Sequence, residues 1–421
     1  MFKHFTAVAV LALFVSTTSA GEFASAKWPR WRGPDASGST TTGKYPTGWA
    51  DGKNIAWKIK LPGRGCSTPI VWGEQIILTT PIDGKDALIS LDWKGKTRWQ
   101  TVIGPQRRGK HRNGSGSNPS PVTDGTHLFA YYKSGRLVGL DMKGKLLWKT
   151  NLQERFAKDT LYWDLGTSPV LTDKHVVVAV MHKGESFLAA FDKKSGEMAW
   201  KTARNYECPT EGDHSYATPT VIQHKGQQAI LTWGAEHVTV HRATDGKLLW
   251  SCGGFNPKGK EFWVAVSSSV VVDGMVVVPY GRGTHLCGVG LGGSGDVTET
   301  HRKWTRKDTG AFVPTPAAFG GKLYLLGDRG EISCVDPKTG KTLWSGALPK
   351  SGKKYYASPT VADGKLYAAR EDGVIYVAQV VGGFKVLSKN VMKEQTIASP
   401  VAVAGHLLIR GATHLVCVKT P

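Results

Sequence analysis

The amino-acid sequence predicts an all-β fold, an eight-bladed β-propeller whose blades are four-stranded antiparallel sheets. Two recurring phrases predict it. A Gly stands four residues before a Trp in five similar segments, of which DPKTGKTLW, Asp336 to Trp344, is one. A small residue followed by Pro opens an apolar strand at positions 69, 121, 169, 219, 316, 359 and 400, and Ser269 replaces Pro in one further copy. Repeats of about 40 to 50 residues with four strands each are typical of propeller blades.

Each repeat has its elements in the same order. The small-Pro strand leads to a turn such as TDGT or VDGM, a second apolar strand, a third strand that ends near an Asp, a Gly turn and the Trp strand. Gly supplies the positive φ that a tight turn requires. The Trp stands on the outermost strand, where burial of its ring against the next blade is worth about 1.5–3 kcal/mol. We expect this docking role for Trp57, Trp99, Trp148, Trp200, Trp250, Trp304 and Trp344.

The ring is predicted to close with a strand from the N-terminal part of the chain. The repeat that opens at Pro400 holds only three strands, and the segment DGKNIAWKIKL, which carries Trp57, offers the fourth. Closure of this kind removes both free sheet edges. The predicted propeller therefore spans residues 51–421, and residues 21–50 form an extended arm in which Trp28 and Trp31 pack against blades.

The first 20 residues have the pattern of a signal peptide. Lys3 precedes an apolar run, and small residues end at Ala20, with a second cleavage site after Ala26. No later run is long enough for a membrane span, and the first Cys is Cys66, so we expect neither a transmembrane segment nor a lipid anchor. The sequence thus predicts a monomeric bacterial protein that is periplasmic or secreted.

The charge balance suggests anionic partners. The formal net charge is +21, of which Lys3 contributes one. Such a surface attracts acidic proteins or anionic polymers such as polysaccharides, although a solvated surface that only maintains solubility is an equal alternative. Export argues against a nucleic-acid partner. We expect an envelope protein or an anionic polysaccharide.

The cysteines and histidines form no recognisable metal or haem motif. The six cysteines contain no CxxC and no CxxCH, and their disulfide pairing stays open. His237 and His241 are four apart on an expected strand, about 13 Å from each other, which is too far to share an ion. No metal site is predicted.

The phrases DxxTGKxxW and SPTV resemble the repeats of pyrroloquinoline-quinone (PQQ)-type propellers over roughly residues 51–421. That family includes quinoprotein alcohol dehydrogenases and the propeller lipoprotein of the outer-membrane-protein assembly machinery. The resemblance implies the fold and two roles, a scaffold of the cell envelope or an oxidoreductase. The quinoprotein dehydrogenases carry two adjacent cysteines beside their cofactor, and this chain has none. We therefore expect no PQQ and favour binding over catalysis, with an oxidoreductase or an enzyme acting on envelope saccharides as the alternative.

The loops on one face of the predicted ring are rich in His, Arg, acidic and aromatic residues. These loops occupy the same place in successive repeats, so their side chains should gather at the channel mouth, the default location of a ligand site. The alternative is that polar loop residues are merely scattered. The sequence pairs no nucleophile with a base, and it names no catalytic residue. The predicted ligand-binding residues are His111, Arg112, Asp164, Asp213, His214, Tyr216, Glu236 and Trp263, with Arg64, Trp163, His237, Arg282, His285 and Arg329 nearby.

Overall fold

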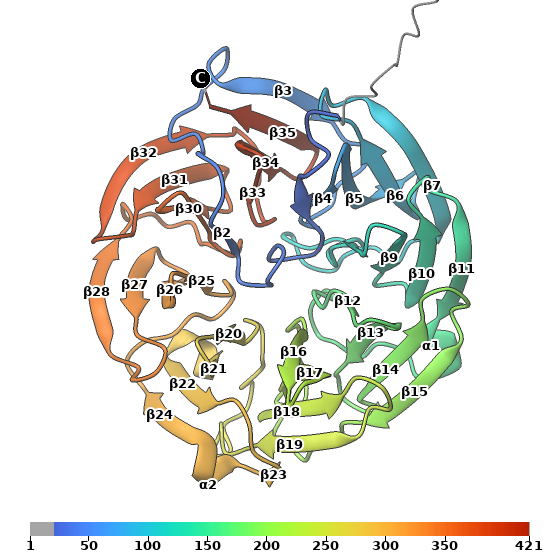
Figure 1. Ribbon diagram of the computed structural model, residues 1–421, viewed down its shortest axis with the longest axis vertical. Coiled ribbons are helices and arrows are strands. Elements are labelled where there is room, and N and C mark those ends of the chain that lie inside the picture. The colour runs from blue at the N-terminus through green and yellow to red at the C-terminus, as the bar shows by residue number, and fades with distance from the viewer. Residues whose placement is uncertain (1–20, 421) are drawn as a thin grey trace, which may run out of the picture.

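Eight β-sheets are arranged as a closed ring around a central axis in the computed structural model, which describes residues 21–420 (Figure 1). The predicted eight-bladed propeller of four-stranded antiparallel blades is confirmed. Helical structure in the described range is limited to α1 (Leu152–Arg155), α2 (Thr298–His301) and one 3-10 turn, η1 (Gly281–Gly283). The predicted signal peptide lies outside the described residues. None of the helices in this range is long and apolar enough to cross a membrane.

The strands of each blade follow one another from the axis outward. Blade 1 consists of β4 (Ile70–Trp72), β5 (Gln75–Ile82), β6 (Lys85–Leu91) and β7 (Thr97–Pro105), and blade 2 of β8 (Val122–Thr123), β9 (His127–Tyr131), β10 (Arg136–Asp141) and β11 (Leu146–Asn151). Blade 3 consists of β12 (Val170–Leu171), β13 (His175–Val180), β14 (Phe187–Asp192) and β15 (Met198–Ala203), and blade 4 of β16 (Thr220–His224), β17 (Gln227–Gly234), β18 (His237–Arg242) and β19 (Leu248–Cys252). Blade 5 consists of β20 (Val270–Val272), β21 (Met275–Tyr280), β22 (His285–Gly290) and β24 (Arg302–Arg306). Blade 6 consists of β25 (Ala317–Phe319), β26 (Lys322–Leu326), β27 (Glu331–Val335) and β28 (Thr342–Ala347). Blade 7 consists of β29 (Thr360–Ala362), β30 (Lys365–Ala369), β31 (Val374–Gln379) and β32 (Lys385–Val391).

Blade 8 joins the two ends of the described chain. Its inner strands are β33 (Val401–Val403), β34 (His406–Arg410) and β35 (His414–Lys419). The outermost strand is β3 (Ile55–Lys60), which pairs antiparallel with β35 and places Trp57 opposite Cys417. Closure by an N-terminal strand is therefore part of the fold, as expected, and it satisfies the edge of β35 that would otherwise stay unpaired.

Tryptophan rings join neighbouring blades at the outer rim. In five blades the ring covers the Gly in the turn of the next blade, and a Cβ on that Gly would collide with the ring in four of them and press tightly against it at Gly95. Trp57 covers Gly95, Trp99 covers Gly144, Trp148 covers Gly196, Trp200 covers Gly246 and Trp304 covers Gly340. Two physical requirements therefore explain why Gly stands at this position: its φ is positive, and the Trp ring occupies the space where a side chain would lie.

The indole N–H groups add a hydrogen bond to this docking contact. Each of the five rings donates to a backbone carbonyl of the same turn in the next blade, at 2.7–3.2 Å, the acceptors being Trp93, Met142, Lys193, Ala243 and Pro337. The acceptor lies one or two residues after the last residue of the third strand. An otherwise buried polar atom is thereby satisfied.

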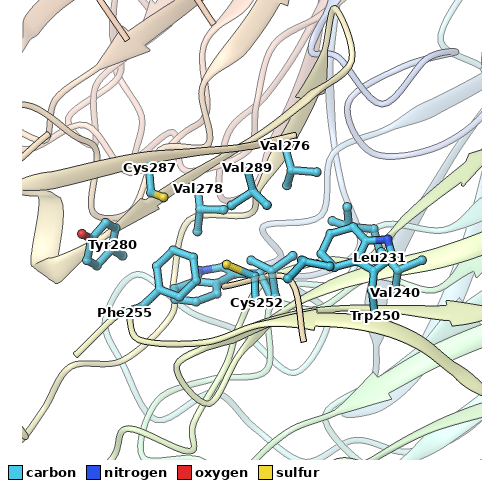
Figure 2. Packing of buried hydrophobic residues seen from close by; sticks show 14 of the residues in the cluster. Leu231, Val240, Trp250, Cys252, Phe255, Val276, Val278, Tyr280, Cys287 and Val289 are labelled. Atoms are coloured by element: carbon cyan, nitrogen blue, oxygen red, sulfur yellow. The ribbon is translucent and has the colours of Figure 1, made fainter. Parts of the chain in front are cut away.

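Two rim tryptophans pack differently. Trp250 is fully buried among the apolar residues shared by blades 4 and 5, where Phe255, Cys252 and Cys287 lie (Figure 2). The short strand β23 (Gly295–Asp296) covers it by pairing with β19. Trp344 stacks on Phe384 of blade 7, with ring centroids 6.1 Å apart. All six cysteines are unpaired.

The N-terminal arm, residues 21–50, crosses the ring near its axis (Figure 1). Its strand β1 (Lys27–Trp28) pairs with β4 of blade 1, and β2 (Ser39–Thr40) runs parallel to β29 of blade 7. Trp28 is almost fully buried in the core between blades 8 and 1. The arm therefore links blade 1 to blade 7, the two neighbours of blade 8, in addition to the closure by β3.

Candidate functional site

The small residues before the prolines form a hydrogen-bonded belt around the channel. In seven of the eight, the hydroxyl oxygen accepts the backbone N–H of the equivalent residue in the preceding blade, at 2.9–3.3 Å; Ser399 is the exception. We call these residues the hydroxyl belt: Thr68, Ser120, Ser168, Thr218, Ser268, Thr315, Ser358 and Ser399. A Ser or Thr is needed here because a side chain must satisfy a backbone group that belongs to no sheet.

The belt surrounds a cavity of about 490 Å³ on the axis. Seven of the eight belt residues line it, together with Trp31 of the arm and aromatic or polar residues of the loops between blades. Because Trp31 of the arm is among the lining residues, the arm bounds one end of the cavity. The loops surround the opposite end, and the cavity is a blind pocket of the size common for small-molecule sites.

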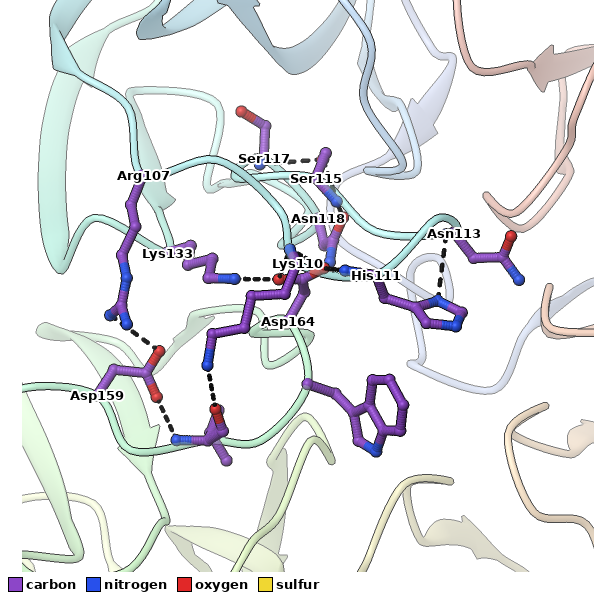
Figure 3. Close-up of polar contacts among 12 residues, drawn as sticks. Arg107, Lys110, His111, Asn113, Ser115, Ser117, Asn118, Lys133, Asp159 and Asp164 are labelled. Atoms are coloured by element: carbon purple, nitrogen blue, oxygen red, sulfur yellow. Dashed lines mark hydrogen bonds and ion pairs between the residues drawn. The ribbon is translucent and has the colours of Figure 1, made fainter.

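A buried ion pair holds one long loop of the mouth, residues 106–121. The Asp164 carboxylate accepts the backbone N–H groups of Lys110 and His111, at 2.8 and 3.0 Å, and pairs with the Lys133 ammonium (Figure 3). The side chains of Lys133 and Asp164 are almost completely inaccessible to solvent. Asp164 lines the cavity, but its negative charge is already compensated.

His111, Asp164 and Tyr216 meet at the cavity wall. His111 Nδ1 accepts the N–H of Asn113 at 3.1 Å, which leaves the proton of the neutral ring on Nε2. The imidazole meets the edge of Trp163, with centroids 5.0 Å apart, and the backbone N–H of Trp163 donates to Tyr216 Oη at 2.9 Å. Burial raises the pKa of Tyr216, so its hydroxyl stays protonated at neutral pH.

The same loop reaches across the mouth to blades 7 and 8. Asn113 donates to Glu371 at 3.3 Å and accepts from Gln395 at 2.6 Å. The exposed guanidinium of Arg112 lies 3.5 Å from Glu371. Arg112 thus stays outside the cavity, on the rim of the mouth.

The other four predicted ligand-binding residues form a second group between blades 3, 4 and 5, outside the cavity lining. Asp213 lies 3.8 Å from His214, whose burial lowers its pKa. Glu236 accepts from Asn256 at 2.6 Å, and burial raises the pKa of its carboxyl. The indole of Trp263 donates to the Phe255 carbonyl at 2.9 Å. These side chains serve contacts within and between the loops of blades 3, 4 and 5 and do not line the cavity.

Among the wider set of mouth residues, Trp163 and Arg282 line the cavity. The Arg282 guanidinium lies 4.7 Å from the centre of the Phe312 ring and donates to the Phe262 carbonyl at 3.0 Å. His237 stacks on Tyr206, and His285 meets the edge of Trp263. The exposed Arg329 and Arg64 stay outside the lining.

The predicted site did not include several of the residues that line the cavity. The hydroxyl belt was visible only as a strand marker, and its hydrogen bonds connect residues about one repeat apart. Phe312 and Tyr356 stand in the repeated loop position, and their phrases, DTGAFVP and KKYYA, carried the signal. No local signal marks Lys133 as the partner of Asp164.

The lining does not match a calcium-bound quinone. Asp164 is the one acidic side chain among the lining residues, and both of its oxygens already accept hydrogen bonds. Calcium requires several oxygen ligands with carboxylate charge. Across residues 21–420, no group of three or more His, Cys, Asp or Glu side chains could hold a metal ion. Cys66 lines the cavity without a second cysteine beside it.

The repeat, the closed ring and the axial pocket define the class of PQQ-type β-propellers. The chain belongs to the family described as outer membrane protein assembly factor BamB, whose sequence profile matches residues 94–318 and 304–411. It is similar to the BamB protein of Yersinia pestis, with 21% identity over 308 residues, which cover 70% of this chain and 72% of that protein.

Solved structures with the same fold include both branches of the class. BamB from Moraxella catarrhalis superimposes with a TM-score of 0.62 at 15% identity, over 87% of this chain and 99% of that one. A europium-containing methanol dehydrogenase gives 0.69 at 13% identity, over 93% and 89%. The quinohemoprotein alcohol dehydrogenase of Comamonas testosteroni gives 0.68 at 12%, over 94% and 81%. At these identities the likeness establishes the fold alone.

Proposed function

We propose that the protein is an exported scaffold of the bacterial cell envelope, that it takes part in protein or envelope assembly, and that it acts by binding. The match to the BamB family over most of the ring is the observation that carries this proposal. The signal-like first 20 residues support export to the periplasm or the exterior.

We place the partner at the mouth of the channel. The loop face carries exposed aromatic side chains, with Tyr162 58%, Trp163 42% and Phe262 49% accessible. Aromatic anchors beside cationic side chains such as Arg112 are the features of a binding surface for an acidic envelope protein or polymer. The opposite face carries the arm and the repeated Gly turns.

Site-specific cross-linking tests this placement. A photoreactive phenylalanine analogue at Tyr162 should give adducts in envelope extracts, and the same analogue at Lys94, an exposed turn position outside the mouth, should give none. Adducts of equal yield from both positions, or adducts from Lys94 alone, would contradict the placement of the partner at the mouth.

The second candidate is a quinoprotein-like oxidoreductase, which the fold of the two dehydrogenases favours. The donor set of the cavity argues against it, because Asp164 is already neutralised by Lys133. Addition of PQQ and calcium with an electron-accepting dye should produce no alcohol-dependent dye reduction. Reduction that saturates with PQQ would overturn the scaffold proposal in favour of the enzyme.

A further inference from the structure

We propose that the blind cavity binds an acidic saccharide of one or two rings, with its anionic group held within the hydroxyl belt. This proposal rests on the proposed binding function and names a ligand for the same mouth. Three independent features of the lining point to this chemistry, namely its unused hydroxyl groups, its uncompensated positive charge and its aromatic walls.

The hydroxyl belt supplies hydrogen-bond donors on every side of the cavity. Six of its seven lining hydroxyls accept a backbone N–H, and among the described residues none of the seven donates to a protein acceptor. A hydroxyl has one proton to donate and two lone pairs. The O–H groups of the belt are therefore available to a ligand whose polar groups surround a central ring, as the hydroxyls of a sugar do.

A cation of the arm lies directly behind the belt. The guanidinium of Arg32 is buried and donates to the carbonyls of Pro316 and Pro359, at 2.8 and 2.7 Å. These prolines directly follow Thr315 and Ser358, two belt residues that line the cavity. Within residues 21–420, Arg32 has no carboxylate partner, and its Nε–H has no acceptor.

The charge around the cavity therefore stays positive. Burial lowers the pKa of Arg32 to about 9, so the guanidinium is protonated at neutral pH. Arg282 adds a second positive charge at the mouth, whereas Lys133 already compensates Asp164. A buried charge without a partner is costly, and an anionic ligand group would relieve that cost.

Aromatic residues provide the walls. Trp163, Tyr216, Phe312 and Tyr356 line the cavity above the belt, and Trp31 lies at its closed end. Flat rings pack against the C–H faces of sugars, while the belt hydroxyls can both donate to and accept from the ligand. A planar aromatic acid would use the rings and the cations but would leave most of the belt hydroxyls without partners, which favours a saccharide.

Titration calorimetry with digalacturonic acid tests the proposal, with the neutral galactose dimer and PQQ as comparison ligands. We expect 1:1 binding of the acidic dimer, weaker at 500 mM than at 50 mM salt, and at least about tenfold weaker binding of the neutral dimer. Equal affinity for the neutral dimer, or tighter binding of PQQ, would overturn the assignment to an acidic saccharide.

Matched variants locate the binding. Arg282→Gln and Thr218→Val should each weaken binding of the acidic dimer about tenfold, whereas Arg329→Gln, at an exposed position outside the lining, should leave it unchanged. Equal loss in Arg282→Gln and Arg329→Gln would mean general surface attraction and would contradict the cavity site. Because Arg282 is exposed, its variant stays informative even if Thr218→Val unfolds.

The two proposals fail in different ways. Absence of digalacturonate binding in a protein that still cross-links from Tyr162 would overturn the saccharide site and leave the scaffold function standing. Saccharide binding without any partner adduct at Tyr162 would overturn the scaffold function and leave the saccharide site standing.

Discussion

The outer rim of the ring and its central channel are built from the same repeat but use it differently. At the rim, five tryptophans make the same contact with the next blade, each over a Gly and each with one hydrogen bond. In the channel, the hydroxyl belt is equally regular, whereas the loops above it differ in length and residue type. Regular docking keeps the ring closed, and the irregular loops are free to form a pocket.

Deletion of residues 21–60 should have the largest effect, because it removes both the arm and β3. Blade 8 would lose its outer strand and expose the edge of β35, so we expect aggregation instead of a folded monomer. Deletion of residues 21–48 keeps β3 and should give a monomer with a lowered melting temperature. Size-exclusion chromatography and thermal unfolding measure both. If the melting temperature were unchanged after deletion of residues 21–60, ring closure would not need β3.

The rim was readable from the sequence because its determinants are local. Gly and Trp lie four residues apart in one turn and strand, so a segment such as Asp192 to Trp200 predicts a docking role for its Trp without knowledge of the neighbouring blade. Even so, Trp250 and Trp344 pack in other ways, because β23 and Phe384 replace the usual Gly turn. The residues directly around Trp250 and Trp344 in the sequence do not indicate these different contacts.

The site was only partly readable, because its contacts join distant repeats. The loop position grouped His111, Asp164 and Tyr216, which line one cavity. It could not reveal that Asp213, His214, Glu236 and Trp263 lie outside that lining, in contacts among the loops of blades 3 to 5. The carboxylate of Asp164 was expected to meet a ligand, yet Lys133, which lies 31 residues earlier, compensates it. The choice between partners depends on side-chain directions that a repeat pattern does not contain.

Substitution of a rim tryptophan should have the next largest effect. Trp200 is 8% exposed and donates to the Ala243 carbonyl, so Trp200→Ala should lower the free energy of unfolding by about 3–5 kcal/mol. Trp344 is only partly buried and stacks on Phe384, so Trp344→Ala should cost about 1–3 kcal/mol. Denaturant unfolding measures both. A larger loss at Trp344 would contradict the docking role of the Gly turn.

The Gly that a tryptophan covers should tolerate no side chain. Gly196 and Gly226 have similar φ values, +73° and +76°, but only Gly196 lies beneath a ring, that of Trp148. Gly226→Ala should therefore cost about 1 kcal/mol through backbone strain alone, and Gly196→Ala about 2–4 kcal/mol. Equal destabilisation in thermal melts would mean that the turn conformation alone explains the repeated Gly.

A buried histidine near the rim of blade 4 should make stability fall in acid. His241 is 2% exposed, with Nδ1 3.0 Å from the Gly246 carbonyl, and burial lowers its pKa to about 4 from 6.5. Between these values the unfolded chain binds more protons than the folded one, so stability is lost as the pH falls from 6.5 to 4, by up to about 3 kcal/mol. His241→Gln should flatten this slope in urea unfolding at several pH values. An unchanged slope would assign the acid sensitivity to other groups.

The smallest effect should come from the hydroxyl belt. Ser168→Ala removes the acceptor of the Ser120 N–H, but Ser168 lines the cavity, where water can take its place. We therefore expect a loss of about 0.5–1.5 kcal/mol, well below that of Trp200→Ala. Thr79 is the matched control, because its buried hydroxyl donates to the Pro119 carbonyl at 3.1 Å outside the cavity lining. Thr79→Val should cost more than Ser168→Ala, since no water can replace the lost bond there. A larger loss for Ser168→Ala than for Thr79→Val would mean that the belt stabilises the ring as the rim does. Its hydroxyls would then not be free to bind a ligand.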